Sequence, residues 1–233
     1  MRLLLLSFVV VLPLAAACDP SLALITVPEG CPNMPLRGPA EFSVPADAVI
    51  DDFEDGDMKL AQVGGRDGTW VGYATPNQAT VFGEASDRCV AHGTHSGHLT
   101  GVQVMNFGGN WNGVLIDPFA QALPFDARSY RGFSFWVAAG VEAAAPLEMP
   151  IGVMTRDTSL GAGICTFCGD YYRAKDNILL TRTWTRWVVE FDDMKQSGQG
   201  QPQVPLRRDQ LVTIMIWPEK TYDIWIDDVR FEP

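Results

Sequence analysis

The sequence has little positive charge and none of the motifs that bind nucleotides. Its 17 lysines and arginines are outnumbered by 28 aspartates and glutamates, which gives a formal net charge of -11. Nucleic acids and anionic lipid headgroups are polyanions, so an acidic surface argues against both as partners. There is no P-loop and no well-placed Rossmann glycine fingerprint. We therefore expect no nucleic-acid partner; the acidic surface fits a neutral ligand, a cation or simple solubility.

Hydrolase signatures are also missing. The chain has neither the GxSxG nucleophile elbow nor the HExxH zinc motif. Glycosidases need two opposed carboxylates with separate roles, and the acidic residues here gather at sheet edges and turns instead. The sequence therefore predicts a binding protein and not an enzyme. A small polysaccharide-active enzyme is the weaker alternative.

Long hydrophobic runs are absent apart from one short leader. Arg2 precedes an apolar run, Leu3 to Leu14, that is shorter than the roughly 20 residues needed to span a bilayer. Three alanines then lead into Cys18, and this junction resembles the lipobox of bacterial lipoproteins. The resemblance implies a signal peptide over residues 1–17 and a lipid on Cys18. The alternative is plain secretion, with Cys18 free or paired.

A lipoprotein of this kind would lie in the bacterial cell envelope, bound to the membrane only through its N-terminal lipid. The outer membrane, the periplasmic side and the cell surface are all open as locations. Residues 18–47 are rich in proline and small residues, which predicts a semi-extended tether. The compartment is oxidising, and the four cysteines after Cys18 allow three pairings. The simplest pairing joins Cys31 to Cys89 and Cys165 to Cys168.

From about residue 48 onward, short apolar runs alternate with a period of two and are separated by glycine, asparagine and aspartate clusters. Regular short strands of this kind predict an all-β sandwich or barrel. The length suits one domain, residues 48–233, which we expect to be a monomer. The predicted strands are Val49–Phe53, Trp70–Ala74, Ala79–Phe82, Gly97–Val104, Asn112–Ile116, Gly132–Val137, Leu147–Met154, Asn177–Leu180, Arg186–Glu190, Leu211–Pro218 and Asp223–Phe231.

Carboxylates gather at the two ends of this domain. In the first predicted strand Phe53 faces the core, so Asp52 and Glu54 share the other face. In the last strand Asp227 shares the inward face with Val229. The first and last strands of a jelly roll are commonly neighbours, so the three carboxylates are expected to meet and to bind a structural calcium ion. The alternative is a solvated acidic edge that discourages strand aggregation.

Five segments occur in an order that resembles a known family. They read IDDFEDGD, HSGHLTG, YRGFSFWV, TWTRWVVEF and YDIWIDDVRF. Together they resemble the jelly-roll carbohydrate-binding modules of the galactose-binding-like superfamily, most closely family eleven and related bacterial envelope lipoproteins. The resemblance spans about residues 48–232. It implies a jelly-roll β-sandwich of two antiparallel sheets that binds polysaccharide or glycan without catalysis. It also implies calcium between the first and last strands, at Asp52, Glu54 and Asp227.

Aromatic residues are plentiful, with seven tryptophans and five tyrosines. Flat aromatic faces suit the C–H surfaces of sugar rings. In the run from Phe133 to Trp136 the two phenylalanines share the core face, which places Ser134 and Trp136 on the other face. Trp111 lies in a stretch rich in glycine and asparagine, where an aromatic ring beside amides makes a sugar platform. We therefore expect Trp111 to bind ligand.

The CxxC segment at residues 165–168 is interpreted as a disulfide-closed loop. A structural zinc site needs a second ligand pair, and a thioredoxin-type redox site needs a βαβ setting; the sequence pattern has neither. A local disulfide would hold the neighbouring aromatic and acidic groups in a fixed geometry, which favours ligand binding. With Trp111, the expected ligand-binding residues are Arg156, Asp157, Phe167, Asp170, Tyr171 and Tyr172. The alternative is a structural or protein-interaction lipoprotein that has this fold and no sugar site.

All three histidines lie within residues 92–98, at three-residue spacing. A helix would gather them on one face, but Gly93 and Gly97 argue against a helix. We therefore expect exposed turn histidines and not a metal site.

Overall fold

The computed structural model describes residues 28–33, 45–61, 63, 66, 68–73, 81–101, 113–116, 124–143, 146–158, 170–196, 198, 204–218 and 220–233. The predicted signal peptide, Cys18, Trp111, Phe167 and the Cys165–Cys168 pair lie outside these residues. Within the described ranges, no helical segment reaches the length and hydropathy that crossing a membrane requires.

The described part of the chain is built from strands, joined by turns and by short 3₁₀ segments at Ala46–Ala48, Phe191–Asp193 and Arg208–Gln210. It contains no α-helix in these ranges. The strands are β1 (Val49–Asp51), β2 (Trp70–Tyr73), β3 (Val81–Ser86), β4 (Ser96–Gly101), β5 (Gly113–Ile116), β6 (Gly132–Ala139), β7 (Leu147–Met149), β8 (Ile151–Thr155), β9 (Tyr172–Arg173), β10 (Ile178–Leu180), β11 (Thr185–Glu190), β12 (Lys195–Gln196), β13 (Leu211–Ile216) and β14 (Tyr222–Glu232).

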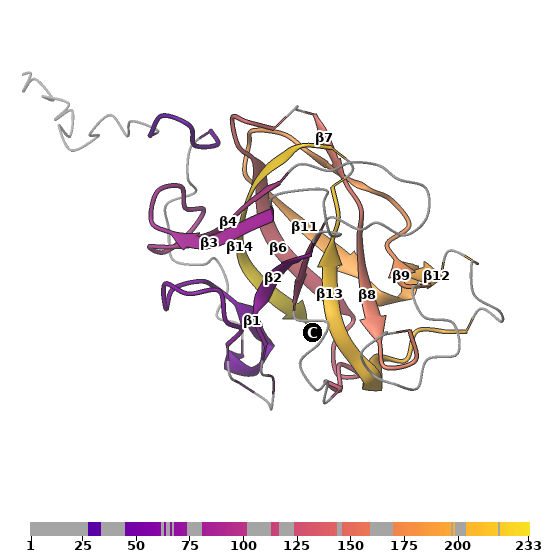
Figure 1. Ribbon diagram of the computed structural model, residues 1–233. Coiled ribbons are helices and arrows are strands. Elements are labelled where there is room, and N and C mark those ends of the chain that lie inside the picture. Colours follow the sequence, from indigo (N-terminus) through magenta and orange to yellow (C-terminus); the bar gives the residue numbers. More distant parts are fainter. Residues whose placement is uncertain are drawn as a thin grey trace, which may run out of the picture.

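Two six-stranded sheets form the two layers of a sandwich (Figure 1). The first sheet runs β11-β6-β14-β4-β3, with β1 also paired to β14, and the second runs β12-β9-β8-β13-β5-β2. All their strand pairs are antiparallel, so the predicted all-β jelly-roll sandwich is confirmed. A further two-stranded ribbon, β10-β7, was not predicted. It arises because Pro150, which has no N–H to donate, divides the predicted strand Leu147–Met154 into β7 and β8.

The core lies between the two sheets. Phe133 and Phe135 of β6 and Ile224 of β14 face it from the first sheet, and Val153 of β8 and Ile216 of β13 face it from the second. All five side chains are buried. Because successive strand residues point to opposite faces, the residues between them lie on the outer faces, where a ligand can reach the sandwich.

The first and last strands pair, as predicted, with Val49 opposite Arg230. The pairing of β14 with β6 shifts between Asp227 and Arg230, and Asp228 in this bulge has a φ of 49°. The bulge shifts the alternation by one residue. The predicted sharing of one face by Asp227 and Val229 is therefore wrong. Val229 joins the core, whereas Asp227 pairs with Trp136 on the outer face.

Arg66 links the segment that leads into β1 to the aromatic core. We expect its contacts to contribute strongly to the free energy of unfolding. Its guanidinium donates to the carbonyl oxygen of Asp47 at 2.7 Å and to that of Val49, and it lies 5.0 Å and 5.6 Å from the ring centroids of Phe125 and Phe231. Arg66→Met removes a charged donor from two carbonyls and a cation from two rings. We expect the free energy of unfolding to fall by about 3 kcal/mol in urea titrations.

The matched control is Arg128→Met. Arg128 is ion-paired to Asp126 at 2.6 Å, but its side chain is 71% exposed, so its loss is expected to change the unfolding free energy by less than about 0.5 kcal/mol. Equal effects of the two substitutions would contradict the structural role assigned to Arg66.

Candidate functional site

The outer face of the first sheet carries a partly exposed tryptophan among charged side chains. Trp136 of β6 pairs with Arg186 of β11 on one side and with Asp227 of β14 on the other. Trp136 is partly exposed and the Arg186 side chain is 28% exposed, whereas Asp227 is buried. One row further along β6, Ser134 points to the same face. We define the Trp136 patch as Trp136, Ser134, Arg186, Arg131 and Glu232.

Glu232 links the polar members of this patch. One of its carboxylate oxygens accepts from the Ser134 hydroxyl and from the Arg186 guanidinium, both at 2.5 Å. The other oxygen lies 3.8 Å from Arg131, which is also 3.4 Å from Glu190. These charge-assisted contacts hold donors and acceptors in a fixed geometry beside the tryptophan ring.

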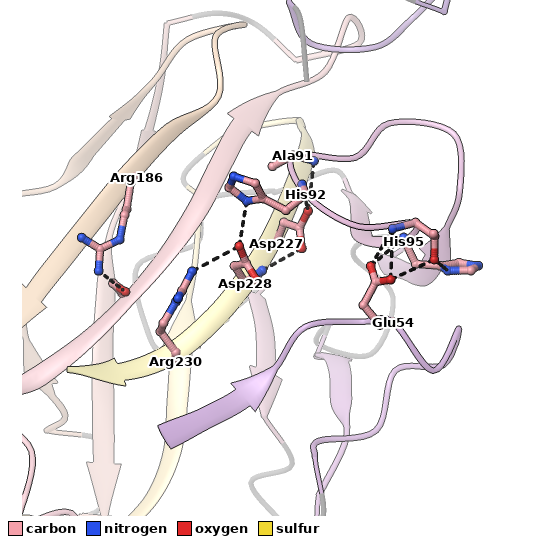
Figure 2. A network of polar contacts seen from close by, with 10 residues as sticks. Glu54, Ala91, His92, His95, Arg186, Asp227, Asp228 and Arg230 are labelled. Atoms are coloured by element: carbon pink, nitrogen blue, oxygen red, sulfur yellow. Dashed lines mark hydrogen bonds and ion pairs between the residues drawn. The ribbon is translucent and has the colours of Figure 1, made fainter. Parts of the chain in front are cut away.

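His92 borders the patch on the β14 side. Its Nδ1 lies 2.7 Å from a carboxylate oxygen of Asp228, which also lies 3.2 Å from Arg230 (Figure 2). The His92 ring meets Trp136 edge-on, with centroids 5.2 Å apart and an angle of 72° between the planes. His92 is only 7% exposed. The prediction of exposed turn histidines is therefore wrong for His92, because its loop folds back onto β14.

Asp227 fixes this loop to the sheet. One of its oxygens accepts from the backbone N–H groups of Ala91 and His92, both at 3.0 Å, and the other accepts from the Asp228 N–H at 2.7 Å (Figure 2). Burial raises the pKa of Asp227 to about 8, against these N–H donors, which lower it. The neighbouring charge of Asp228 adds to the rise.

Glu54 holds the same loop at a second point. Its carboxylate accepts from the backbone N–H groups of Thr94 and His95 at 2.8 Å and 3.0 Å, and from the Thr94 hydroxyl at 2.9 Å. Burial alone would raise the pKa of Glu54, but these donors outweigh it and lower the pKa. Gly93, with a φ of 66°, lets the backbone pass directly over this carboxylate, where a Cβ would lie 2.2 Å from it.

The predicted calcium ligands Asp52, Glu54 and Asp227 are not assembled as a ligand set. Asp52 is exposed, and the oxygens of the other two already accept N–H or O–H donors. Among the described residues, no three His, Cys, Asp or Glu side chains are placed to hold a metal ion. Calcium takes six to eight oxygen ligands, which can include backbone carbonyls, so these three side chains alone do not make its site. Calcium between the first and last strands stays a prediction.

The sequence reasoning did not single out Asp51, which is the inward carboxyl of β1. It is 2% exposed and accepts from the Phe53 N–H at 2.8 Å and from the Trp70 indole N–H at 2.7 Å. Burial raises its pKa to about 7, although both donors lower it. Asp51 turns inward because it pairs with Val229, which joins the core, after a register shift in β1. Alternation did not show this, since Ile50 is also in the core and Phe53 lies beyond β1 with a φ of 59°.

The predicted ligand-binding residues are dispersed. Arg156 is exposed, and Asp157 lies 3.7 Å from Arg207 on the surface. Asp170, Tyr171 and Tyr172 are buried, at 2%, 6% and 1% exposure.

The two adjacent tyrosines separate because neighbouring strand residues face opposite ways. Tyr172 enters the core, where burial raises its pKa to about 12, and its hydroxyl donates to the Pro205 carbonyl at 3.3 Å. Tyr171 instead lies on the outer face of the second sheet. The structure therefore does not gather the described members of the predicted set into one exposed face.

The outer face of the second sheet has its own aromatic cluster. Tyr171 packs there with Met154, Met215 and Trp217, and all four are buried. The guanidinium of Arg173 lies 5.3 Å from the Trp217 ring centroid. Among the described residues, the aromatic rings on this outer face are buried, whereas Trp136 on the outer face of the first sheet is partly exposed.

No protein-family model and no curated protein matches the chain. Among solved structures it is similar to the family 11 carbohydrate-binding module of the cellulosomal cellulase Lic26A-Cel5E of Clostridium thermocellum, with a TM-score of 0.49, 14% identity, and 76% of this chain and 94% of that chain covered. It is also similar to the CBM22-1 xylan-binding domain of Paenibacillus barcinonensis Xyn10C, with a TM-score of 0.45, 16% identity, and 82% and 97% covered. Both are modules of the type that the sequence motifs resemble.

Proposed function

We propose that this protein binds carbohydrate at the Trp136 patch, without catalysing a reaction on it. The observation that carries the proposal is the partial exposure of Trp136, whereas Trp184, Trp217 and Trp225 on the outer faces are buried. An open indole face stacks on the C–H surface of a sugar ring. Arg186 beside it, with a side chain that is 28% exposed, offers hydrogen-bond donors to sugar hydroxyls.

The charges of the patch favour a neutral glycan. Arg186 lies 2.5 Å from Glu232, and Arg131 lies 3.4 Å from Glu190, so each arginine already faces a carboxylate. An acidic sugar would have to displace one of these pairs. The formal net charge of the chain, -11, also disfavours polyanions.

Binding without catalysis is supported by the state of the carboxylates. Glu232 and Asp228 each contact an arginine, so neither carboxylate can approach a glycosidic bond without giving up that contact. The motif resemblance to carbohydrate-binding modules points the same way. On this proposal a lipid on Cys18 holds the domain at the bacterial envelope, an assignment that rests on the sequence.

The test is calorimetric titration of the full chain against neutral oligosaccharides and their parent polysaccharides, including β-glucans, xylans and mannans. We expect Trp136→Ala to weaken binding at least about tenfold, because aromatic anchors of binding sites carry about 2 kcal/mol or more. The matched control is Leu179→Ala on β10, which truncates an apolar side chain that is 49% exposed on the separate β10-β7 ribbon. It is expected to leave affinity unchanged.

Two results would overturn the proposal. If Trp136→Ala binds as tightly as the wild type, the site lies elsewhere. If the folded wild-type chain binds no glycan, with calcium or with chelator, the structural or protein-interaction role is favoured instead.

A further inference from the structure

The sheet surface next to Trp136 is closed on one side. Ala138, the next outward residue of β6, pairs with Trp225 of β14. Ala138, Trp225 and Trp184 are 0%, 2% and 5% exposed, and they form one buried cluster with Cys89. A sugar stacked on Trp136 therefore has no open sheet surface to continue along in the direction of Ala138.

The N-terminal segment 28–33, here called the strap, accounts for part of this closure. A disulfide joins Cys31 of the strap to Cys89, and Cys31 packs against the buried cluster. At the end of the strap, the Asn33 N–H donates to the Arg182 carbonyl at 2.6 Å. The strap is thus fixed to the domain both by a disulfide and by a backbone hydrogen bond.

A second, adjacent side is closed by His92. Its ring stands edge-on to Trp136 above β14, and it is 7% exposed. Asp227 and Asp228 fix His92 at its backbone and at its ring (Figure 2). A ligand cannot extend across β14 without displacing this loop.

Among the described residues, the side toward β11 is the most exposed. There lie Arg186 and Val188, whose exposures are 28% and 38%. Toward the Gly132 end of β6, Ser134 and Glu232 are 0% and 8% exposed, although the side chain of Arg131 beyond them is 59% exposed. The exposed direction, across β11, lies opposite the side that His92 closes.

We infer that the Trp136 patch binds the end of a glycan chain and not its interior. This inference rests on the proposed function. An internal sugar of a linear glycan continues in two roughly opposite directions, and each such path across Trp136 is blocked at one side. A terminal sugar continues in one direction only, so it stacks on Trp136 while the chain leaves over β11.

The experiment measures the binding capacity of insoluble neutral polysaccharides for the full wild-type chain, before and after limited acid hydrolysis. Hydrolysis multiplies the chain ends while the mass of polysaccharide stays constant. We expect the capacity to rise in proportion to the number of reducing ends, with Trp136→Ala setting the background.

A capacity that follows polysaccharide mass and not chain ends would overturn the inference and leave the proposed function in place. Absence of binding to every polysaccharide and to its soluble oligosaccharides would remove the proposed function, and the inference with it.

Discussion

Replacing both Cys31 and Cys89 with serine is expected to lower the free energy of unfolding by about 4 kcal/mol, the chain entropy that closing a loop of this length removes. The two cysteines are 58 positions apart in the sequence, and Cys89 is 3% exposed among buried tryptophans. The double variant removes the covalent link between the strap and the domain, and it also removes the cross-link that restricts the unfolded chain. Urea unfolding of the oxidised wild type and the variant measures the difference.

The same double substitution at Cys165 and Cys168 is the matched comparison. These cysteines are three positions apart, so a disulfide between them would close a short loop and contribute only about 2 kcal/mol. If the Cys31/Cys89 variant unfolds at the same urea concentration as the wild type, the strap is not held in the way described.

The second large effect concerns pH. The folded-state pKa of Asp51 is about 7, against an ordinary value of 3.8, so the folded chain binds a proton that the unfolded chain releases between these values. The contribution of Asp51 to stability is complete below about pH 4 and is lost as pH rises through about 7. Its size is up to roughly 4 kcal/mol. Asp227, with a pKa of about 8, acts in the same direction.

Urea unfolding at intervals between pH 5 and 7 measures this dependence. We expect the free energy of unfolding to rise as the pH falls. In the Asp51→Asn variant, the dependence of this free energy on pH should be smaller by the amount that corresponds to about one bound proton. Asp126→Asn is the control, because Asp126 is half exposed and its pKa is lowered to about 2, so it does not titrate in this window. A wild-type stability that is flat or rises with pH would contradict the buried, protonated state of Asp51.

The strands that could be predicted from the sequence are those in which apolar and polar residues alternate. The period-two pattern located β6, β11, β13 and β14 within a few residues, because each of these strands has one face on the core. β9 and β12, with two residues each, are too short to show a period. The bulge at Asp228 was also missed, because a one-residue shift appears only when two strands are paired.

The candidate site was predictable only in part. Alternation placed Trp136 and Ser134 together on the outer face, and the structure agrees. It gave no reason to prefer Trp136 to Trp111, because the Arg186 and Glu232 contacts depend on strand register and on the bulge. The predicted Tyr171 and Tyr172 are neighbours in sequence, but they pack on opposite faces of the second sheet.

The most direct measurement is the response of the indole N–H signals in a ¹⁵N–¹H NMR spectrum as a neutral oligosaccharide is added to the full chain. The seven tryptophans give separate signals, which single Trp→Phe variants assign. We predict that Trp136 shifts most, while the buried Trp184 and Trp225 shift little. A spectrum in which Trp111 or Trp217 shifts and Trp136 does not would contradict the account and place the ligand on another surface.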